Sequence, residues 1–329
     1  EINIESSMVS PRIDLSKSRD ARSNHQSPVS SRETKVECLG ECCNVYSENL
    51  IAFQNVQLVK AQGKSEKGPL PNFLFNTQGG VSLSFKDVVC ESNVQNATLL
   101  CNKSVCRQFI AKSSVFKGFK VILHENSTQV QSFMCCGFED CGGPSSVHHD
   151  YIETSRGVNS FFSKPTENSN PQDFNSIIFA VNPLILQVID CKFANFSSSC
   201  IRLEFRDASK PAAVQILETK FEGGAHNCIT LKGFVAASSK LKIIIESCSF
   251  TGGEKAQLRL ITLIPRSIKI LFCNFSKCAS ESIFLDGCAN YSIDDCNFSD
   301  IESECLLGAS DLRRISAPSR LPHPCHPVD

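Results

Sequence analysis

The sequence has no tryptophan, 3 tyrosines and 2 methionines among its 329 residues. Few aromatic side chains other than phenylalanine are therefore available to stack on sugar rings, which argues against a lectin or a glycosidase. The sequence also lacks an excess of either charge, since it has 33 basic and 34 acidic residues. This balance argues against a nucleic-acid partner, which requires a basic field.

Long apolar segments and common catalytic motifs are missing too. No apolar run reaches about 18 residues, so the sequence predicts no membrane-spanning helix. No HExxH, GxGxxG or Ser-His-Asp arrangement occurs in a convincing context. The sequence begins at Glu1 rather than Met, without a charged and then apolar leader. We therefore expect it to be part of a longer protein, and anchorage in a membrane through a segment missing from this sequence stays open.

Phenylalanine and cysteine are abundant, with 23 and 19 residues. They recur together in a short motif, exemplified by Cys248-Ser249-Phe250, which Gly252-Gly253 follows. From Phe193 onward the phenylalanines of successive copies are 28, 29, 25 and 23 residues apart. The predicted ladder residues are Cys136, Phe138, Cys191, Phe193, Phe221, Cys248, Phe250, Cys273, Phe275, Cys296 and Phe298. Such a period, about 22–29 residues, is typical of repeat architectures.

Each copy has the pattern of two strands joined by a turn. An apolar, β-branched segment such as 241–245 precedes the motif, and a second segment such as Cys200-Ile201-Arg202-Leu203 follows it. The Cys and the Phe are two residues apart, so they lie on one face of a strand, and the polar residue between them lies on the other. We expect Cys and Phe to face the core, and the Gly-Gly pairs to form corners that need a positive φ.

The repeat predicts an all-β fold, a right-handed parallel β-helix (β-solenoid), because stacked parallel units bury an apolar face that one unit cannot bury alone. An antiparallel β-sandwich is the competing prediction. We expect a disordered N-terminal tail at 1–35, the β-helix at 36–309 with its regular rungs at 184–308, and a disordered C-terminal tail at 310–329.

One interval departs from the period. Phe138 and Phe193 are 55 residues apart, about two periods. This spacing predicts one degenerate rung at 151–162, followed by a protruding loop at 163–173 that is rich in Pro, Asn and Ser.

The high cysteine count leaves alternatives open. A disulfide framework is typical of small secreted domains, and this chain is not small. Thiols packed in the core as small apolar groups are the simpler interpretation for the ladder cysteines. Neighbouring ladder cysteines could also be cross-linked between rungs, since the separation of their Cα atoms falls within the disulfide range.

Asn-x-Ser/Thr sequences indicate possible N-glycosylation. Those at Asn274 and Asn297 lie between the Cys and the Phe of the motif, at a position expected to face water. The full set is Asn96, Asn102, Asn126, Asn195, Asn274, Asn290 and Asn297. Together they favour a secreted or cell-surface location.

Other polar clusters give weak indications of chemistry. Asp294-Asp295 could supply paired carboxylates, but adjacent residues of a strand face opposite ways. Glu139-Asp140 and His148-His149-Asp150 are more readily interpreted as solvated loops. The cysteines near 38–43 and 135–141 lack a second half-site at zinc spacing, and a disulfide-pinned cap is a stronger interpretation for the first group. We therefore predict no catalytic residue, no metal site and no cofactor.

The Cys-x-Phe-x-x-Gly-Gly rungs over about 110–308 resemble right-handed β-helix proteins of the pectin-lyase-like superfold. More narrowly, they resemble the Cys-rich, polymorphic-membrane-protein-like surface proteins of parasitic protists such as trichomonads. This resemblance implies a non-enzymatic scaffold that serves adhesion or structure and binds a protein or glycan ligand. A polysaccharide lyase or glycoside hydrolase of the same superfold, and an intracellular repeat scaffold, remain as alternatives.

Overall fold

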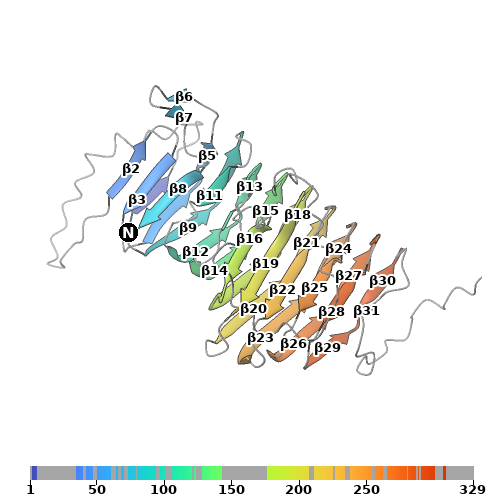
Figure 1. The fold of residues 1–329 in the computed structure, drawn as a ribbon. Helices are drawn as coiled ribbons and strands as arrows, with labels where there is room; N and C mark the ends of the chain where they lie inside the picture. Colours follow the sequence, from blue (N-terminus) through green and yellow to red (C-terminus); the bar gives the residue numbers. More distant parts are fainter. Residues whose placement is uncertain are drawn as a thin grey trace, which may run out of the picture.

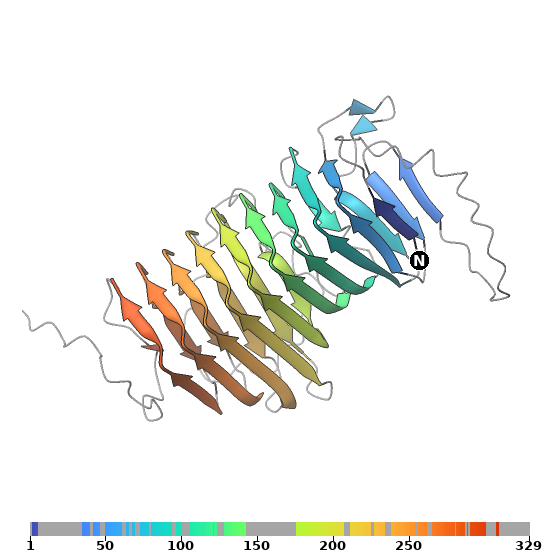
Figure 2. The same ribbon diagram turned by 180° about the vertical axis from the view of Figure 1, so that it is seen from behind.

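The computed structural model consists of β-strands and contains no helix in the part of the chain that it describes. The strands are stacked along one axis from the N-terminal to the C-terminal part of the chain (Figure 1), and the view from behind shows the same order (Figure 2). The described residues are 2–5, 35–39, 42–46, 50–60, 64–65, 68–69, 73–78, 80–93, 97–100, 106–120, 122–123, 128–142, 176–206, 211–224, 227–233, 238–253, 256–261, 265–279, 281–286, 288, 290–300 and 307–308. Within these ranges no helix is long and apolar enough to cross a membrane.

The largest sheet has ten strands, with residues of alternating burial along most of them. Its strands, in spatial order, are β1 (Ile2–Glu5), β4 (Leu50–Gln54), β9 (Val81–Lys86), β12 (Cys106–Lys112), β14 (Thr128–Met134), β17 (Ile185–Ile189), β20 (Ala212–Leu217), β23 (Ser238–Glu246), β26 (Pro265–Leu271) and β29 (Tyr291–Asp294).

The second sheet has nine short strands, and the Phe of each sequence motif is the middle residue of one of them. These strands are β5 (Gln57–Lys60), β10 (Val89–Ser92), β13 (Val115–Lys117), β15 (Gly137–Glu139), β18 (Lys192–Ala194), β21 (Lys220–Glu222), β24 (Ser249–Thr251), β27 (Asn274–Ser276) and β30 (Asn297–Ser299).

Three further sheets complete the fold. The six-stranded sheet contains β16 (Ser176–Val181), β19 (Ser199–Phe205), β22 (Ile229–Gly233), β25 (Leu258–Ile261), β28 (Ile283–Asp286) and β31 (Leu307–Gly308). The four-stranded sheet contains β11 (Thr98–Leu100), β8 (Phe73–Gln78), β3 (Cys42–Tyr46) and β2 (Lys35–Leu39), and a hairpin joins β6 (Lys64–Ser65) to β7 (Gly68–Pro69).

One turn of the chain contributes a strand to each of the ten-, nine- and six-stranded sheets, as β17, β18 and β19 do before β20 begins the next turn. Each strand pairs in parallel with its equivalent on the next turn. Among the described strands, only the pairs β2–β3 and β6–β7 are antiparallel. The protein is therefore a parallel β-solenoid, as the repeat predicts, and the antiparallel β-sandwich is excluded.

A column of stacked phenylalanine rings runs through the core. The rings of Phe138 and Phe193 are 4.3 Å apart, and Phe193 and Phe221 are 5.0 Å apart. The column continues through Phe250, Phe275 and Phe298 with centroid distances of 4.9, 4.8 and 5.1 Å and interplanar angles of 9° or less. These distances match the separation of adjacent strands, about 4.8 Å, so the register of the backbone sets the ring spacing.

The corner before each short strand is left-handed on nine successive turns, yet no glycine occupies it. Asparagine and aspartate adopt this left-handed backbone conformation more readily than other residues with side chains. A bulky residue such as Phe272 rarely adopts it. The amide of Asp190 donates to Leu217 O, and that of Glu218 donates to Glu246 O, so this corner continues the inter-turn hydrogen-bond ladder. The residues, with φ between 50° and 55°, are Asn55, Asp87, Ser113, Cys135, Asp190, Glu218, Ser247, Phe272 and Asp295.

The predicted glycine corners follow the short strands. Gly223 and Gly224 have φ values of 78° and 134°, and Gly252 and Gly253 have 79° and 127°. At Gly224 a Cβ atom would lie 2.0 Å from the ring of Phe196, so this glycine is also required by packing.

The degenerate rung predicted between Phe138 and Phe193 is wrong. β14 pairs directly with β17, and β15 pairs directly with β18. The 55-residue interval therefore spans one turn of the solenoid and is longer than the other intervals, and β16 is the one strand among its described residues between β15 and β17. The residues 143–175, which include the rung predicted at 151–162 and the loop at 163–173, lie outside the described residues.

The terminal segments differ in part from the expectation. Residues 2–5, which fall in the predicted disordered tail at 1–35, form β1 and pair in parallel with β4. The remaining residues up to 34 lie outside the described part, as does the predicted C-terminal tail at 310–329.

Candidate functional site: the outer face of the six-stranded sheet

Charged and aromatic side chains form a row on the outer face of the six-stranded sheet. The register pairs Phe179 with Arg202, Arg202 with Thr230, Thr230 with Arg259, and Arg259 with Phe284. We call these five residues the outer row. Adjacent members of the row are about 4.8 Å apart along the solenoid axis.

Strand alternation explains why the outer row faces away from the core. Ile201 and Leu203 flank Arg202 and are fully buried, whereas the Arg202 side chain is 30% exposed. The same alternation places Leu258 and Leu260 in the core and Arg259 outside it. The two apolar neighbours therefore fix the direction of each arginine.

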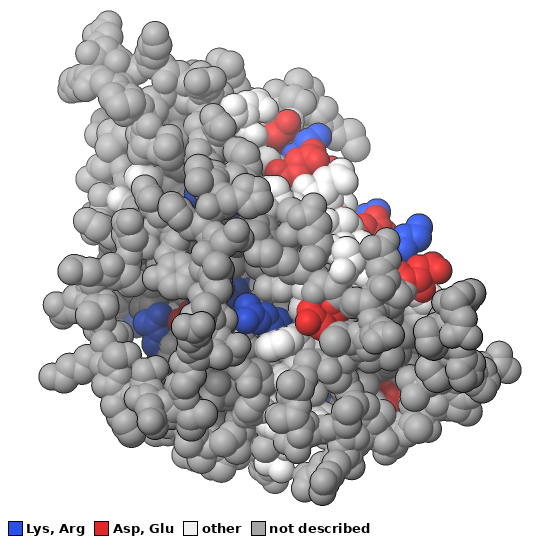
Figure 3. Space-filling model, turned by 45° about the vertical axis from the view of Figure 1, so that its right-hand side comes forward, with Lys and Arg blue, Asp and Glu red and all other residues white. Residues whose placement is uncertain are grey.

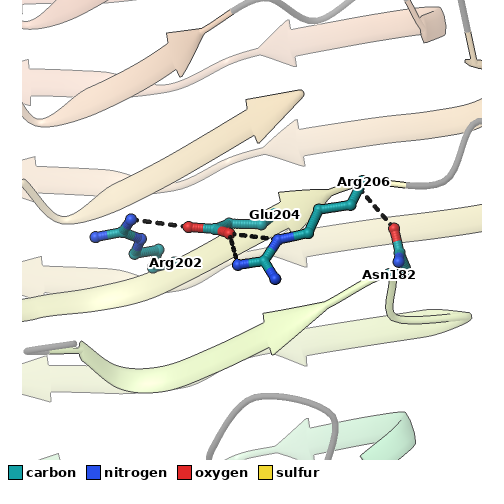
Figure 4. A network of polar contacts seen from close by, with 4 residues as sticks. All are labelled: Asn182, Arg202, Glu204 and Arg206. Atoms are coloured by element: carbon teal, nitrogen blue, oxygen red, sulfur yellow. Dashed lines mark hydrogen bonds and ion pairs between the residues drawn. The ribbon is translucent and has the colours of Figure 1, made fainter. Parts of the chain in front are cut away.

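Glu204 is the centre of an ion-pair network beside the outer row (Figure 4). Its Oε1 accepts from Arg202 Nη2 at 2.8 Å, and its Oε2 accepts from Arg206 at 2.6 Å for Nη2 and 3.0 Å for Nε. The amide of Arg206 donates to Asn182 Oδ1 at 2.7 Å. Residues 202, 204 and 206 alternate along one strand and its extension, so their side chains lie on the same face.

The environment of Glu204 keeps its carboxyl group ionised. Its side chain is 3% exposed, and burial by itself raises the pKa. The hydrogen bonds and charges of Arg202 and Arg206 outweigh burial and hold the pKa of Glu204 below its usual value. Both carboxylate oxygens are paired with guanidinium groups, so at neutral pH Glu204 serves as a fixed anion that orients the two arginines.

Aromatic rings support the two arginines of the outer row. The guanidinium carbon of Arg202 lies 5.7 Å from the ring centroid of Phe179, and that of Arg259 lies 5.3 Å from the ring centroid of Phe284. Both distances are within the range of cation–π attraction. A guanidinium group has planar N–H donors, which suit carboxylate, sulfate or phosphate groups and sugar hydroxyls.

Charge elsewhere on the described surface is mixed. Glu91, Lys117 and Glu139 are in register on neighbouring turns of the nine-stranded sheet, and Lys192 pairs with Glu222 at 2.7 Å. The space-filling view shows acidic and basic side chains next to one another rather than a patch of one sign (Figure 3). Exposed pairs of this kind contribute little stability and no directed site.

The ladder cysteines and phenylalanines lie in the core. Cys136, Cys191, Cys248, Cys273 and Cys296 are buried, as are the ladder phenylalanines except Phe298, which is partly buried at the end of the column. These side chains therefore contribute to the packing of the core.

The described glycosylation candidates are on the surface. Asn274 and Asn297 are exposed and in register on β27 and β30. Asn195 and Asn290 are exposed at corners, with φ values of 53° and 56°. Asn96, Asn102 and Asn126 lie outside the described residues.

The other polar clusters are not assembled into a site within the described ranges. Asp294 ends β29, and Asp295 is exposed at the following corner. Glu139 and Asp140 are exposed beside β15. The described side chains include no group of three His, Cys, Asp or Glu that could hold a metal ion. The cluster at 148–150 is outside the described residues.

The two N-terminal cysteine strands form a hairpin. Cys38 on β2 lies opposite Cys43 on β3 in an antiparallel pair. This placement is compatible with the predicted disulfide-pinned cap, which stays a prediction.

The sequence did not single out Arg202, Glu204, Arg206 or Arg259. The signal that could have found them is the alternation Arg-x-Glu-x-Arg over 202–206, which places three charges on one face of a strand. Comparisons add no further assignment: no family model, no curated protein and no solved structure matches this chain.

Proposed function

We propose that this chain is a secreted or cell-surface β-helix scaffold that binds a protein or glycan ligand and catalyses no reaction. The observation that carries the proposal is the outer row of the six-stranded sheet, where the partly exposed guanidinium groups of Arg202 and Arg259 lie over aromatic rings, in register. Phe179 and Thr230 are buried, at 1% and 7% exposed, so a ligand would reach the row at the two arginines and at Phe284. Arginine is enriched among the residues that contribute most to binding at protein interfaces. The likeness of the rungs to Cys-rich surface proteins of parasitic protists supports the same assignment.

Two further features support the location. Four glycosylation candidates are exposed, and two of them are on neighbouring turns of one sheet. Treatment of the native protein with an N-glycosidase tests the location: a gain in electrophoretic mobility that Asn274→Gln and Asn297→Gln abolish in part supports it. An unchanged mobility would favour the intracellular scaffold.

Ligand binding is tested with the purified chain on an array of neutral and acidic glycans and on cultured cells. We expect Arg259→Ala to weaken binding at least tenfold, because the variant removes a donor from the outer row. Lys269→Ala is the matched control, since Lys269 is exposed on the outer face of the ten-stranded sheet. Cells treated with glycosidases distinguish a glycan ligand from a protein ligand.

Two results would overturn this function. If the wild-type chain, Arg259→Ala and Lys269→Ala bound equally well, the outer row would not be the ligand-binding surface. Release of unsaturated or reducing sugars from an array glycan would instead establish the carbohydrate-active enzyme.

A further inference from the structure

A second column of the core lies beside the phenylalanine rings. It contains the residue two positions before each ladder Phe, and the strand register aligns these residues on six successive turns. In order they are Cys136, Cys191, Thr219, Cys248, Cys273 and Cys296, which we call the thiol column. All six are buried, and the five cysteines are free thiols.

The strand register places the side chains of Cys136 and Cys191, and those of Cys248, Cys273 and Cys296, on adjacent turns. Each thiol donates to backbone carbonyls, as Cys191 does to Phe133 O at 3.5 Å and Ile189 O at 3.3 Å. Adjacent parallel strands place Cα atoms about 4.8 Å apart. This separation lies within the range of about 4.4–6.8 Å that a disulfide spans.

Thr219 divides the thiol column into a pair and a triplet. Its hydroxyl donates to Leu217 O at 2.9 Å, and the Cys191 amide donates to that hydroxyl at 3.4 Å. Cys191 and Cys248 are thus separated by two turns, about 9.6 Å. A disulfide cannot bridge Cα atoms more than about 7 Å apart, so the two groups must react independently.

Within each group, one thiol favours ionisation and its neighbour does not. The neighbouring thiol of Cys191 lowers the pKa of Cys136, and that of Cys273 lowers the pKa of Cys248. The same pairings, together with burial, raise the pKa of Cys191 and of Cys273. The thiolate is the nucleophile in disulfide exchange, so the directions of these shifts favour Cys136 and Cys248 as the attacking thiols.

We propose that the thiol column is an oxidative modification site that forms disulfides from turn to turn, one between Cys136 and Cys191 and one between Cys273 and either Cys248 or Cys296. The co-reactant is a small-molecule disulfide such as oxidised glutathione. The Cys136 thiolate attacks one of its sulfur atoms and releases the first small thiol. Cys191 then loses its proton, attacks the Cys136 sulfur and displaces the second small thiol.

The exchange is balanced in atoms and electrons. Two protein thiols are oxidised to one disulfide, and one small disulfide is reduced to two thiols. In the triplet, the same exchange consumes two thiols and leaves one. Disulfide formation in the purified chain depends on the spacing of the thiols, and not on the ligand or the location proposed above.

The test begins with the purified, reduced full chain. It is incubated with oxidised glutathione at pH 8, and the remaining thiols are alkylated under denaturing conditions and mapped by mass spectrometry. A parallel incubation contains urea just below the unfolding transition, so that local opening admits the oxidant to the core. Cys135, which is exposed beside the column, reports whether the oxidant reaches the protein.

We expect peptides that link Cys136 to Cys191, and Cys273 to Cys248 or Cys296, with one thiol of the triplet still alkylated. A link between Cys191 and Cys248 would overturn the proposal, because it requires another register. Complete alkylation of all five cysteines in both incubations would also overturn it.

Two variants provide matched controls. Thr219→Cys closes the gap in the column, so links from residue 219 to Cys191 or to Cys248 should appear. Cys191→Ser should trap Cys136 as a mixed disulfide with glutathione, without a link to another cysteine, while the triplet reacts as in the wild type. If Cys191→Ser fails to fold, Cys136→Ser tests the same pair from the other side. A Cys136 that links to any other cysteine in Cys191→Ser would contradict the assignment.

Discussion

The contribution of one ring of the phenylalanine column to the free energy of unfolding can be measured at Phe250. Phe250 is fully buried, and its ring lies 4.9 Å from that of Phe221 and 4.8 Å from that of Phe275, with interplanar angles of 3° and 1°. Truncation of a buried Phe to Ala typically costs about 3–5 kcal/mol. We expect Phe250→Ala to reach the upper part of this range, because two ring contacts are lost, each worth about 0.5–1.5 kcal/mol beyond burial.

Two further variants change positions that differ from Phe250 in burial and in ring contacts. Phe298 is partly buried and contacts one ring of the column, that of Phe275 at 5.1 Å, so Phe298→Ala should cost about half as much. Ser249, the outward neighbour of Phe250 on β24, is partly exposed, so Ser249→Ala should cost less than about 0.5 kcal/mol.

Urea unfolding monitored by circular dichroism, extrapolated to water, gives the three free energies. Hydrogen exchange of the amides in β24 and β27 shows whether the loss is confined to neighbouring turns, as nearest-neighbour coupling in a solenoid predicts. Equal losses for Phe250→Ala and Ser249→Ala would refute the inward and outward assignment. Equal losses for Phe250→Ala and Phe298→Ala would refute the combined contribution of burial and ring contacts.

The corners and the charged network give two more predictions. Gly224→Ala should lower the free energy of unfolding by about 3 kcal/mol or more, because φ is 134° and the new Cβ would lie 2.0 Å from the Phe196 ring. Gly223→Ala should lower it by about 1 kcal/mol, because φ is 78° and no atom lies near the new Cβ. Thermal unfolding of the two variants measures both losses. Glu204→Gln should cost about 1–3 kcal/mol at pH 7, since it leaves two arginines without their anion. Because the folded-state pKa of Glu204 lies below its ordinary value, this contribution is fully present above the ordinary value, about 4.3, and is lost as the pH falls through the lower value. A stability difference between wild type and Glu204→Gln that persists at pH 2 would contradict the ion-pair explanation.

Much of the fold follows from residues two positions apart. The Cys-x-Phe spacing predicts which side chains enter the core, and the recurrence of the motif predicts that equivalent strands pair in parallel. Both expectations hold because alternate residues of each strand are apolar. This alternation fixes which face of the strand is buried, and thereby its register with the next turn. The corners were predicted where Gly occurs, and Asp190 has a residue type that favours the left-handed region. At Glu218 and Phe272 no local preference indicates the positive φ, and their amides donate to Glu246 O and Asp294 O of the next turn.

The insertion between Phe138 and Phe193 shows where a period misleads. An interval of about two periods is equally compatible with two turns and with one turn that carries an insertion. The pairing of β15 with β18 decides for the insertion. Loop length costs little free energy, since the entropy of closure grows only logarithmically, so the period does not constrain what lies between two strands.

The outer row could be predicted in part. The Cys-Ile-x-Leu signature aligns Cys200 with Cys228, and it thereby aligns Arg202 with Thr230. On the next turn the signature is Gln257-Leu258-Arg259-Leu260, which lacks the cysteine and therefore escapes a search for that motif. The two leucines are nevertheless sufficient to place Arg259 outward and in register, because alternation of apolar residues, and not the cysteine, fixes the strand. A search for outward residues that recur between buried neighbours would therefore find this face, and the distances from each arginine to its ring would still require the structure.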